Sequence, residues 1–300
     1  MVTKEFMKDL KSKLQENIKM AAFDIDGTIM PFGQPIFSDG IKQMFRELKS
    51  KDIYSILSTA REFVTIGNFL EQLPEVNYFI GANGMFIYDV QNKSFVYENP
   101  IELNDLKILY VALFGKEALT GEYEKINKFP DLESLTVTDL NWCYHSPNIN
   151  KNTWFLSPHH AKLKPMDFDI IDKNHIHIIT LGSYNQEATN RLEKYVKKII
   201  AKNNLPLEVN SKWNKGVFIT PKNVTKFHAL ELLAKKLNLD AKKNLIAFGD
   251  STNDYEMLIN AAYSVGLGEH DPNIKKITKM NAKPVEQDGS YLALKELGIL

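Results

Sequence analysis

Short apolar segments that alternate with amphipathic ones constrain the fold of this chain most. Residues 20–25 begin with four apolar side chains, as in a short buried strand. Residues 38–49 carry apolar side chains at helical spacing, and residues 53–57 form a second, mostly apolar segment. The same alternation returns near the C terminus, where an amphipathic segment at 226–237 precedes an apolar run at 245–248. Strands that alternate with helices predict an α/β fold with a parallel sheet covered by helices.

The alternation stops in the middle of the chain. Two apolar runs within 86–97 flank a short polar turn, which predicts a hairpin, and the strand-like and helical runs that follow have no regular order. We therefore predict that an insertion with its own α+β fold splits the sheet domain. The predicted boundaries give a core of residues 1–84 and 213–300 and an insertion of residues 85–212.

The first nineteen residues predict a separate amphipathic helix. Phe6, Leu10, Leu14 and Ile18 recur every four residues, as on one stripe of a helix. Acidic side chains within this stretch argue against an organelle transit peptide, and it has no apolar core of the secretory kind. We expect a plain helix that leads into the fold.

Composition excludes several classes of partner. The 37 Lys and Arg residues balance the 37 Asp and Glu residues, so no net charge draws the chain towards nucleic acid or an anionic membrane. No apolar run approaches the ~20 residues needed to span a bilayer. The single cysteine, Cys143, excludes an internal disulfide and fits a reducing, cytoplasmic compartment. The sequence does not define an oligomeric state.

The strongest chemical signal is Asp24-Ile25-Asp26-Gly27-Thr28, at the end of the first apolar run. Two carboxylates that lie two residues apart at a strand end can face one crevice. There they can hold a divalent cation while one oxygen attacks phosphorus. Gly27 allows the tight backbone turn that this arrangement requires. Taken alone, the segment is also compatible with a simple polar turn.

A second carboxylate pair lies within residues 249–254, directly after the apolar run 245–248. Asp250 is the obvious further magnesium ligand, because Mg²⁺ usually takes one or two protein carboxylates together with phosphate and water. The alternative is a helix cap, since Asp, Ser, Thr and Asn all favour that position.

Thr59 and Lys226 occupy two further positions that suit phosphate. Thr59 follows a predicted strand, and a hydroxyl with free N–H groups at a helix start binds phosphate well, although an N-cap is the alternative. Lys226 lies near the start of a predicted helix, a mildly unfavourable place for a cation that a bound phosphate would explain; a surface lysine is the alternative. Ligands of open α/β sheets bind beyond the carboxyl ends of the strands, so we expect these segments to converge.

The four segments, in this order, resemble the motifs of the haloacid dehalogenase superfamily of phosphatases. Thr59 looks like the residue of the second motif, although Ala60 stands where glycine is more usual, and Lys226 looks like the residue of the third. The long insertion, and Asn83-Gly84 at its entry, are similar to the large cap of the Cof-type, subclass IIB members. The resemblance covers essentially everything after residue 20 and implies a Rossmann-like core with an inserted cap.

The resemblance also implies the catalytic roles. Asp24 would attack phosphorus and form an aspartyl-phosphate, while Asp26 would protonate the leaving oxygen and then activate water. The carboxylates of Asp24 and Asp250, with the backbone carbonyl of Asp26, would hold Mg²⁺.

The remaining motif residues would bind phosphate or support the metal. By the same resemblance, Thr59, Lys226 and Asn253 would hold the phosphate oxygens. Asp254 would orient the surroundings of the metal instead of binding it directly.

The function implied by the resemblance is magnesium-dependent hydrolysis of a small phosphorylated metabolite. Sugar phosphates are the first candidate class, and the cap would choose the substrate. One alternative is a phosphotransferase of the same superfamily, such as a phosphomannomutase, in which a sugar hydroxyl replaces water. A catalytically silent binding protein is disfavoured, because it would need none of the motif residues.

Two pairs of histidines, His159-His160 and His175 with His177, could suggest a zinc site. Alternation places His175 and His177 on one face of a strand, but no cysteine pair joins them. We therefore interpret these histidines as residues of the cap, which can line its substrate surface, and not as metal ligands.

Overall fold

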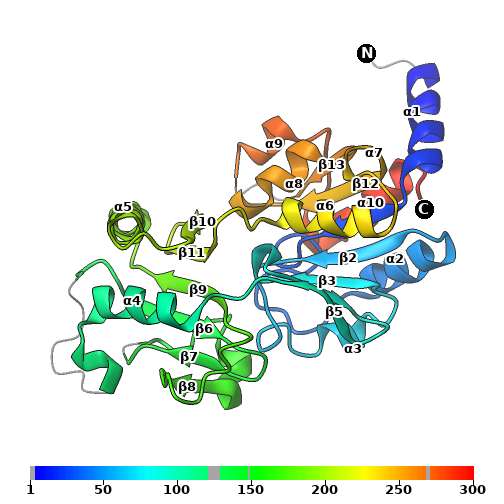
Figure 1. The fold of residues 1–300 in the computed structure, drawn as a ribbon. Helices are drawn as coiled ribbons and strands as arrows, with labels where there is room; N and C mark the ends of the chain where they lie inside the picture. Colours follow the sequence, from blue (N-terminus) through cyan, green and yellow to red (C-terminus); the bar gives the residue numbers. More distant parts are fainter. Residues whose placement is uncertain (1–3, 121–128, 148, 268–270) are drawn as a thin grey trace. The chain divides into compact units, whose positions relative to one another are not determined.

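The structure is a computed structural model that describes residues 4–120, 129–147, 149–267 and 271–300. The chain forms two compact units, each with a sheet of its own (Figure 1). The first unit comprises residues 1–59, 68–97 and 226–300, and the second comprises residues 60–67 and 98–225.

An eight-stranded sheet forms the centre of the first unit, in the order β14-β13-β12-β1-β2-β3-β4-β5. Its strands are β1 (Met20–Phe23), β2 (Tyr54–Ser58), β3 (Tyr78–Gly81), β4 (Phe86–Asp89), β5 (Ser94–Glu98), β12 (Leu245–Gly249), β13 (Tyr263–Gly266) and β14 (Met280–Asn281). All pairings from β14 to β3 are parallel, and β4 pairs antiparallel with β3. The predicted α/β fold with a parallel sheet is confirmed.

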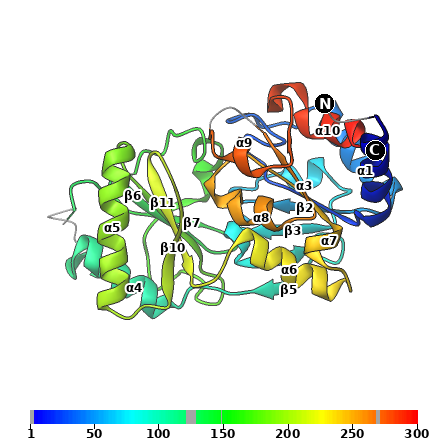
Figure 2. The same cartoon turned by 90° about the horizontal axis from the view of Figure 1, so that it is seen from above.

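Helices cover both faces of this sheet. On one face, Phe45 of α2 (Asp39–Ser50) packs against Phe23 of β1, with ring centroids 5.4 Å apart. On the other face, Phe227 and Leu230 of α6 (Lys226–Lys236) join the core formed by alternate strand residues such as Met20, and α6 lies along β3 (Figure 2). The remaining helices of this unit are α1 (Lys4–Asn17), α3 (Phe69–Gln72), α7 (Ala241–Asn244), α8 (Tyr255–Asn260), α9 (Ile274–Ile277) and α10 (Gly289–Glu296).

The N-terminal segment forms the expected helix. Leu14 of α1 and Ile18 just after the helix are buried, so the C-terminal part of the predicted apolar stripe faces the protein. Gln15 of α1 donates a hydrogen bond to the carbonyl oxygen of Gly298 near the C terminus. The side chain of Phe6, which the stripe also includes, lies outside the described residues. Helix α1 is therefore attached to the first unit through the C-terminal segment.

The second unit is built on a six-stranded sheet in the order β10-β11-β9-β6-β7-β8. Its strands are β6 (Ser134–Thr138), β7 (Cys143–His145), β8 (Leu163–Pro165), β9 (His177–Gly182), β10 (Leu207–Trp213) and β11 (Gly216–Pro221). Helix α5 (Gln186–Lys202) packs against β10 and β11 and contacts α4 (Leu103–Phe114). The mixture of a largely antiparallel sheet with helices is the α+β composition expected of the insertion.

The boundaries between the units differ from those expected at residues 84/85 and 212/213. Strand β4 pairs with β3, so β4 and β5 extend the first sheet and the first unit continues to residue 97. At the other end, β11 pairs with β10 and β9, so the second unit continues to residue 225. Both shifts arise because strand pairing, which local composition does not encode, decides the sheet to which a strand belongs.

Within the described ranges, no helix combines the length and the apolar character that a bilayer-spanning segment needs.

Candidate active site

Asp24 stands where the central strand β1 ends. All four residues of β1 are buried, and the backbone N–H of Asp24 donates to the carbonyl oxygen of Phe248 in β12, 3.1 Å away. The chain then turns sharply: Gly27 has a φ of +84° and donates its N–H to Met30 O at 2.8 Å. The turn leaves Asp24 buried and Asp26 half-buried at the carboxyl edge of the sheet.

Gly27 also allows a second carboxylate to approach. A Cβ atom at this position would lie 2.6 Å from an oxygen of Asp250, closer than real Cβ contacts come. Asp250 follows β12, the neighbour of β1, and its other oxygen accepts a hydrogen bond from the Thr28 hydroxyl at 3.2 Å. The glycine is therefore required both for the left-handed backbone and for the packing of Asp250.

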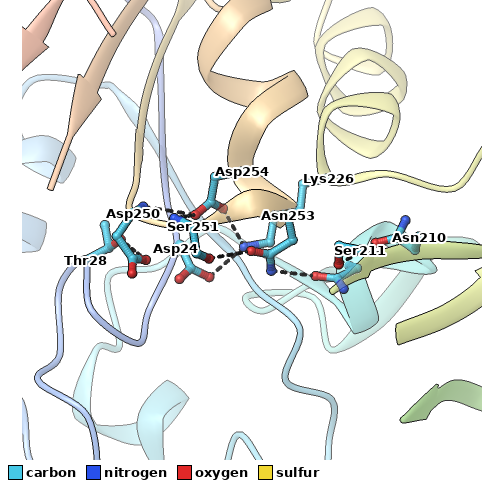
Figure 3. Close-up of polar contacts among 10 residues, drawn as sticks. Asp24, Thr28, Asn210, Ser211, Lys226, Asp250, Ser251, Asn253 and Asp254 are labelled. Atoms are coloured by element: carbon cyan, nitrogen blue, oxygen red, sulfur yellow. Dashed lines mark hydrogen bonds and ion pairs between the residues drawn. The ribbon is translucent and has the colours of Figure 1, made fainter. Parts of the chain in front are cut away.

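Lys226 lies between two carboxylates (Figure 3). Its ammonium nitrogen is 2.6 Å from Asp24 Oδ1 and 2.7 Å from Asp254 Oδ1, and its side chain is fully buried. As the first residue of α6, it is held by a helix whose apolar side chains pack on the sheet. A buried lysine in this position is not the surface lysine that the sequence alone also allowed.

Asp254 shapes the loop that carries Asp250. One of its oxygens accepts from Lys226, and the other accepts the backbone N–H groups of Asp250 and Ser251 at 3.0 and 3.1 Å. Asp254 ends the short 3₁₀ helix Thr252–Asp254, for which Ser251 is the cap. The helix cap considered from sequence is thus present, and it coexists with the carboxylate cluster.

Burial and mutual repulsion raise the pKa values of carboxyl groups in this cluster. Oxygens of Asp24, Asp250 and Asp254 all lie within 4.8 Å of one another. Burial raises the pKa of Asp24 to about 7 against the opposing charge of Lys226, and the charges of Asp254 and Asp26 add to the increase. Burial, together with the charges of Asp24 and Asp254, raises the pKa of Asp250 well above its usual range. Burial alone would lower the pKa of Lys226, but the charges of Asp24 and Asp254 together have the larger effect and raise this pKa above its usual range.

These residues fit a hard divalent cation. Three carboxylates and one lysine carry a formal charge of −2 when all four are ionised, and the gathered donors are carboxylate oxygens, which Mg²⁺ prefers. The hydrogen bonds described above use both oxygens of Asp254 but only one oxygen each of Asp24 and Asp250. Asp24 and Asp250 are therefore better placed than Asp254 to bind a cation.

Thr59 and Asn253 reach the same edge of the sheet through Asn83. Leu57 of β2 pairs with Phe23 of β1, so Thr59 follows β2 beside the segment that carries Asp24. Thr59 O accepts the N–H of Asn83 at 2.9 Å, and the Asn83 side-chain oxygen accepts from Asn253 Nδ2 at 3.0 Å. The structure thus gathers Asp24, Lys226, Asp250 and Asp254 in one cluster, and Asn83 links the Thr59 backbone to Asn253.

Two residues of this site received no role from the sequence. Thr28 and Asn83 both position the predicted residues, Thr28 by bonding to Asp250 and Asn83 by linking Thr59 to Asn253. Thr28 was visible only as the last position of the first motif. The signal for Asn83 was its pairing with Gly84, and asparagine tolerates the left-handed backbone (φ +56°) that it adopts.

Comparison with known proteins identifies the family of this site. A model of haloacid dehalogenase-like hydrolases matches residues 21–294. A 5-amino-6-(5-phospho-D-ribitylamino)uracil phosphatase of Bacillus subtilis is 24% identical over 284 residues, which cover 93% of this chain and 95% of the relative. Two solved structures share the fold: a subclass IIB sugar phosphatase (TM-score 0.72, 18% identity, 94% and 100% coverage) and a haloacid dehalogenase-like hydrolase from Bacteroides thetaiotaomicron (0.75, 17%, 93% and 99%). The chain therefore belongs to the haloacid dehalogenase-like hydrolases.

Proposed function

We propose that this phosphatase hydrolyses a small phosphorylated metabolite, in the sugar-phosphate class, in a magnesium-dependent reaction. The observation that carries the proposal is the buried cluster in which Lys226 joins Asp24 to Asp254 and an oxygen of Asp250 lies within 4.8 Å of theirs. A site with this charge pattern attracts a divalent cation and can neutralise a phosphoryl group beside a carboxylate nucleophile. The buried Cys143 is the only cysteine, which fits a cytoplasmic enzyme.

In the first half of the proposed reaction, a carboxylate oxygen of Asp24 attacks phosphorus. The bond from phosphorus to the ester oxygen breaks, Asp26 donates a proton to the leaving alcohol, and an aspartyl-phosphate forms. In the second half, Asp26 removes a proton from water, which attacks phosphorus and releases inorganic phosphate and the free Asp24 carboxylate.

The other residues of the site would orient the phosphoryl group and neutralise its charge. Lys226, Thr59 and Asn253 would bind the phosphate oxygens, and Asp254 would keep Lys226 and the Asp250 loop in position. Mg²⁺, held by Asp24, Asp250 and the Asp26 backbone carbonyl, would supply charge neutralisation of the phosphoryl oxygens.

The relatives and the second unit support the proposed substrate class. One relative acts on a phosphorylated ribityl compound and one similar structure is a sugar phosphatase, and both substrates are polyhydroxylated phosphate esters. We assign substrate choice to the inserted unit, predicted as residues 85–212 and found as a unit with a sheet of its own.

Incubation of the full-length protein with a panel of phosphorylated metabolites tests this function. We expect Mg²⁺-dependent release of inorganic phosphate, with sugar phosphates turned over faster than nucleotides or pyridoxal phosphate. A chelator should stop the reaction and added Mg²⁺ should restore it. Transfer of phosphate between sugars without its release would identify a phosphotransferase instead. Absence of turnover even with aryl phosphates would contradict the proposal.

The pKa of Asp24 predicts how magnesium affects stability as the pH changes. Because the folded protein raises this pKa from 3.8 to about 7, the folded state binds more protons than the unfolded chain between these values. The metal-free protein therefore loses this contribution to stability as the pH rises through about 7. Mg²⁺ binds the ionised carboxylates, so the increase in Tm that it causes should be larger at pH 8 than at pH 5.5.

Differential scanning fluorimetry with and without Mg²⁺ measures this difference, and titrating groups that do not contact the ion cancel in the comparison. Asp250→Asn is the control and should lose most of the magnesium effect at both pH values. An increase in Tm that is equal at pH 5.5 and pH 8 would contradict the assignment of the cluster as the metal site.

A further inference from the structure

A second cluster of potential metal ligands lies in the second unit, and its members come from distant parts of the sequence. Glu98 is the last residue of β5, His177 is the first residue of β9, and His175 lies two residues before it. Glu98 Oε1 is 2.7 Å from His175 Nδ1 and 2.7 Å from His177 Nε2. One carboxylate therefore joins two imidazole rings.

The backbone holds these side chains in place. The N–H of Ile101 donates to the carbonyl oxygen of the buried Ile176 at 2.9 Å, which fixes the segment after Glu98 beside the segment that carries both histidines. The pairing of β9 with β6 shifts in register between Thr136 and Thr138, and Thr138 pairs with His177. The next residue, Ile178, has a φ of +24°, a costly conformation for a β-branched residue. The irregular backbone thus lies directly beside His177.

The donor set suits a cation of the zinc type. One donor atom from each of Glu98, His175 and His177 lies within 4.8 Å of the other two. Tetrahedral zinc with bonds of about 2.0–2.1 Å needs its donors about 3.3 Å apart, so the two 2.7 Å contacts would have to open by only about 0.6 Å. Imidazole nitrogen with one carboxylate favours Zn²⁺ or Co²⁺ over Mg²⁺, in contrast to the oxygen donors around Asp24.

The charge states of these side chains and their exposure to solvent also suit a bound cation. Burial raises the pKa of Glu98, but hydrogen bonds from both histidines outweigh it and hold that pKa below its usual range. Burial lowers the pKa of His177 and favours the neutral imidazole that a metal requires. The side chain of His177 is fully buried, whereas those of Glu98 and His175 are 16% and 26% exposed and offer a route for the ion.

We propose that Glu98, His175 and His177 form a second metal site, distinct from the carboxylate cluster and selective for a zinc-like divalent cation. On binding, each imidazole places its proton on the ring nitrogen that does not face Glu98, and water completes the coordination. The ion would tie Glu98 to His177, which lie 79 positions apart, and so stabilise the second unit at the point where the chain enters it. This proposal does not depend on the proposed substrate.

Titration of the full-length protein with Zn²⁺ or Co²⁺ in saturating Mg²⁺ tests the proposal. The Mg²⁺ suppresses binding at the carboxylate cluster, and the visible spectrum of Co²⁺ reports nitrogen ligands directly. We expect one equivalent to bind, with a higher Tm. Glu98→Gln and His175→Gln should each weaken Zn²⁺ binding by more than the ~10–100-fold that loss of an outer partner typically costs. His175→Gln is the safer variant, since the side chain is partly exposed.

The matched control is His160→Gln, which removes an exposed histidine of the same unit. It should bind Zn²⁺ like the unchanged protein, and all variants should keep magnesium-dependent stabilisation at the Asp24 cluster. Equal Zn²⁺ affinity in the unchanged protein, Glu98→Gln and His175→Gln would overturn the proposal. So would the absence of Zn²⁺ binding to the unchanged protein, which would leave the three residues as a hydrogen-bonded group only.

Discussion

Asp24→Asn is expected to abolish turnover almost completely. An amide cannot form the acyl-phosphate, and it is a poorer ligand for a divalent cation than the carboxylate it replaces. The substitution also removes one of the two carboxylates that bond to Lys226, so phosphate release should be measured at a temperature at which the variant is folded. Initial rates of phosphate release from an aryl phosphate provide the measurement.

Asp26→Asn is the informative comparison, because it should affect a different step. Its backbone carbonyl is unchanged, so Mg²⁺ and phosphate should still bind, and loss of proton transfer should slow turnover by ~10²–10⁴. The loss should shrink for an aryl phosphate whose phenol leaves without a proton. The phosphoenzyme should then form in a burst and hydrolyse slowly. If Asp24→Asn kept near-normal turnover while Asp26→Asn formed no phosphoenzyme from an acidic phenol ester, the two roles would have to be exchanged.

Lys226→Met is expected to destabilise the metal-free protein by ~3–5 kcal/mol and to remove activity. The lysine side chain is fully buried between Asp24 and Asp254, and breaking a buried ion pair leaves uncompensated charge. Saturating Mg²⁺ should recover part of the stability, because it neutralises the same carboxylates. Urea unfolding with and without Mg²⁺ measures both effects.

Lys236→Met is the matched control, since this lysine lies on the same helix and is exposed. Its free energy of unfolding should change by less than about 0.5 kcal/mol. The double variant Lys226→Met/Asp254→Asn removes one carboxylate together with the lysine, and it should be more stable than Lys226→Met alone. Equal stability of Lys226→Met and the unchanged protein would show that the lysine does not compensate these carboxylates.

Most of the first unit could be predicted from local sequence patterns. Buried parallel strands are continuous apolar runs, and the polar residues that follow them must lie at one edge of the sheet. This is why Asp24, Thr59 and Asp250 could be grouped before their distances were known. Helix α2 also follows from local sequence: the apolar stripe expected within 38–49 is buried, and Ser38 caps the helix by accepting from Ile41 N–H at 3.0 Å.

The limits of the two units could not be predicted in this way. Strand β4 has the composition of a strand in either unit, and its antiparallel pairing with β3 places it in the first. The same holds for β11, which pairs with β9 and β10 in the second. A strand's partner depends on hydrogen bonds to residues far along the chain, so local composition carries little information about it.

The sequence alone determined the parallel sheet, the order of its motifs and the chemical types at its carboxyl edge, because strand periodicity and strand-end position are local properties. Only the tertiary structure decided which side chains meet. It placed Asn83 between Thr59 and Asn253. It engaged both carboxylate oxygens of Asp254 in hydrogen bonds within the protein. It also brought Glu98 into contact with His175 and His177. No third ligand for the two histidines could be recognised from the sequence, because Glu98 lies 77 positions before His175. Contacts over such separations form only when the sheets assemble, and no local pattern encodes them.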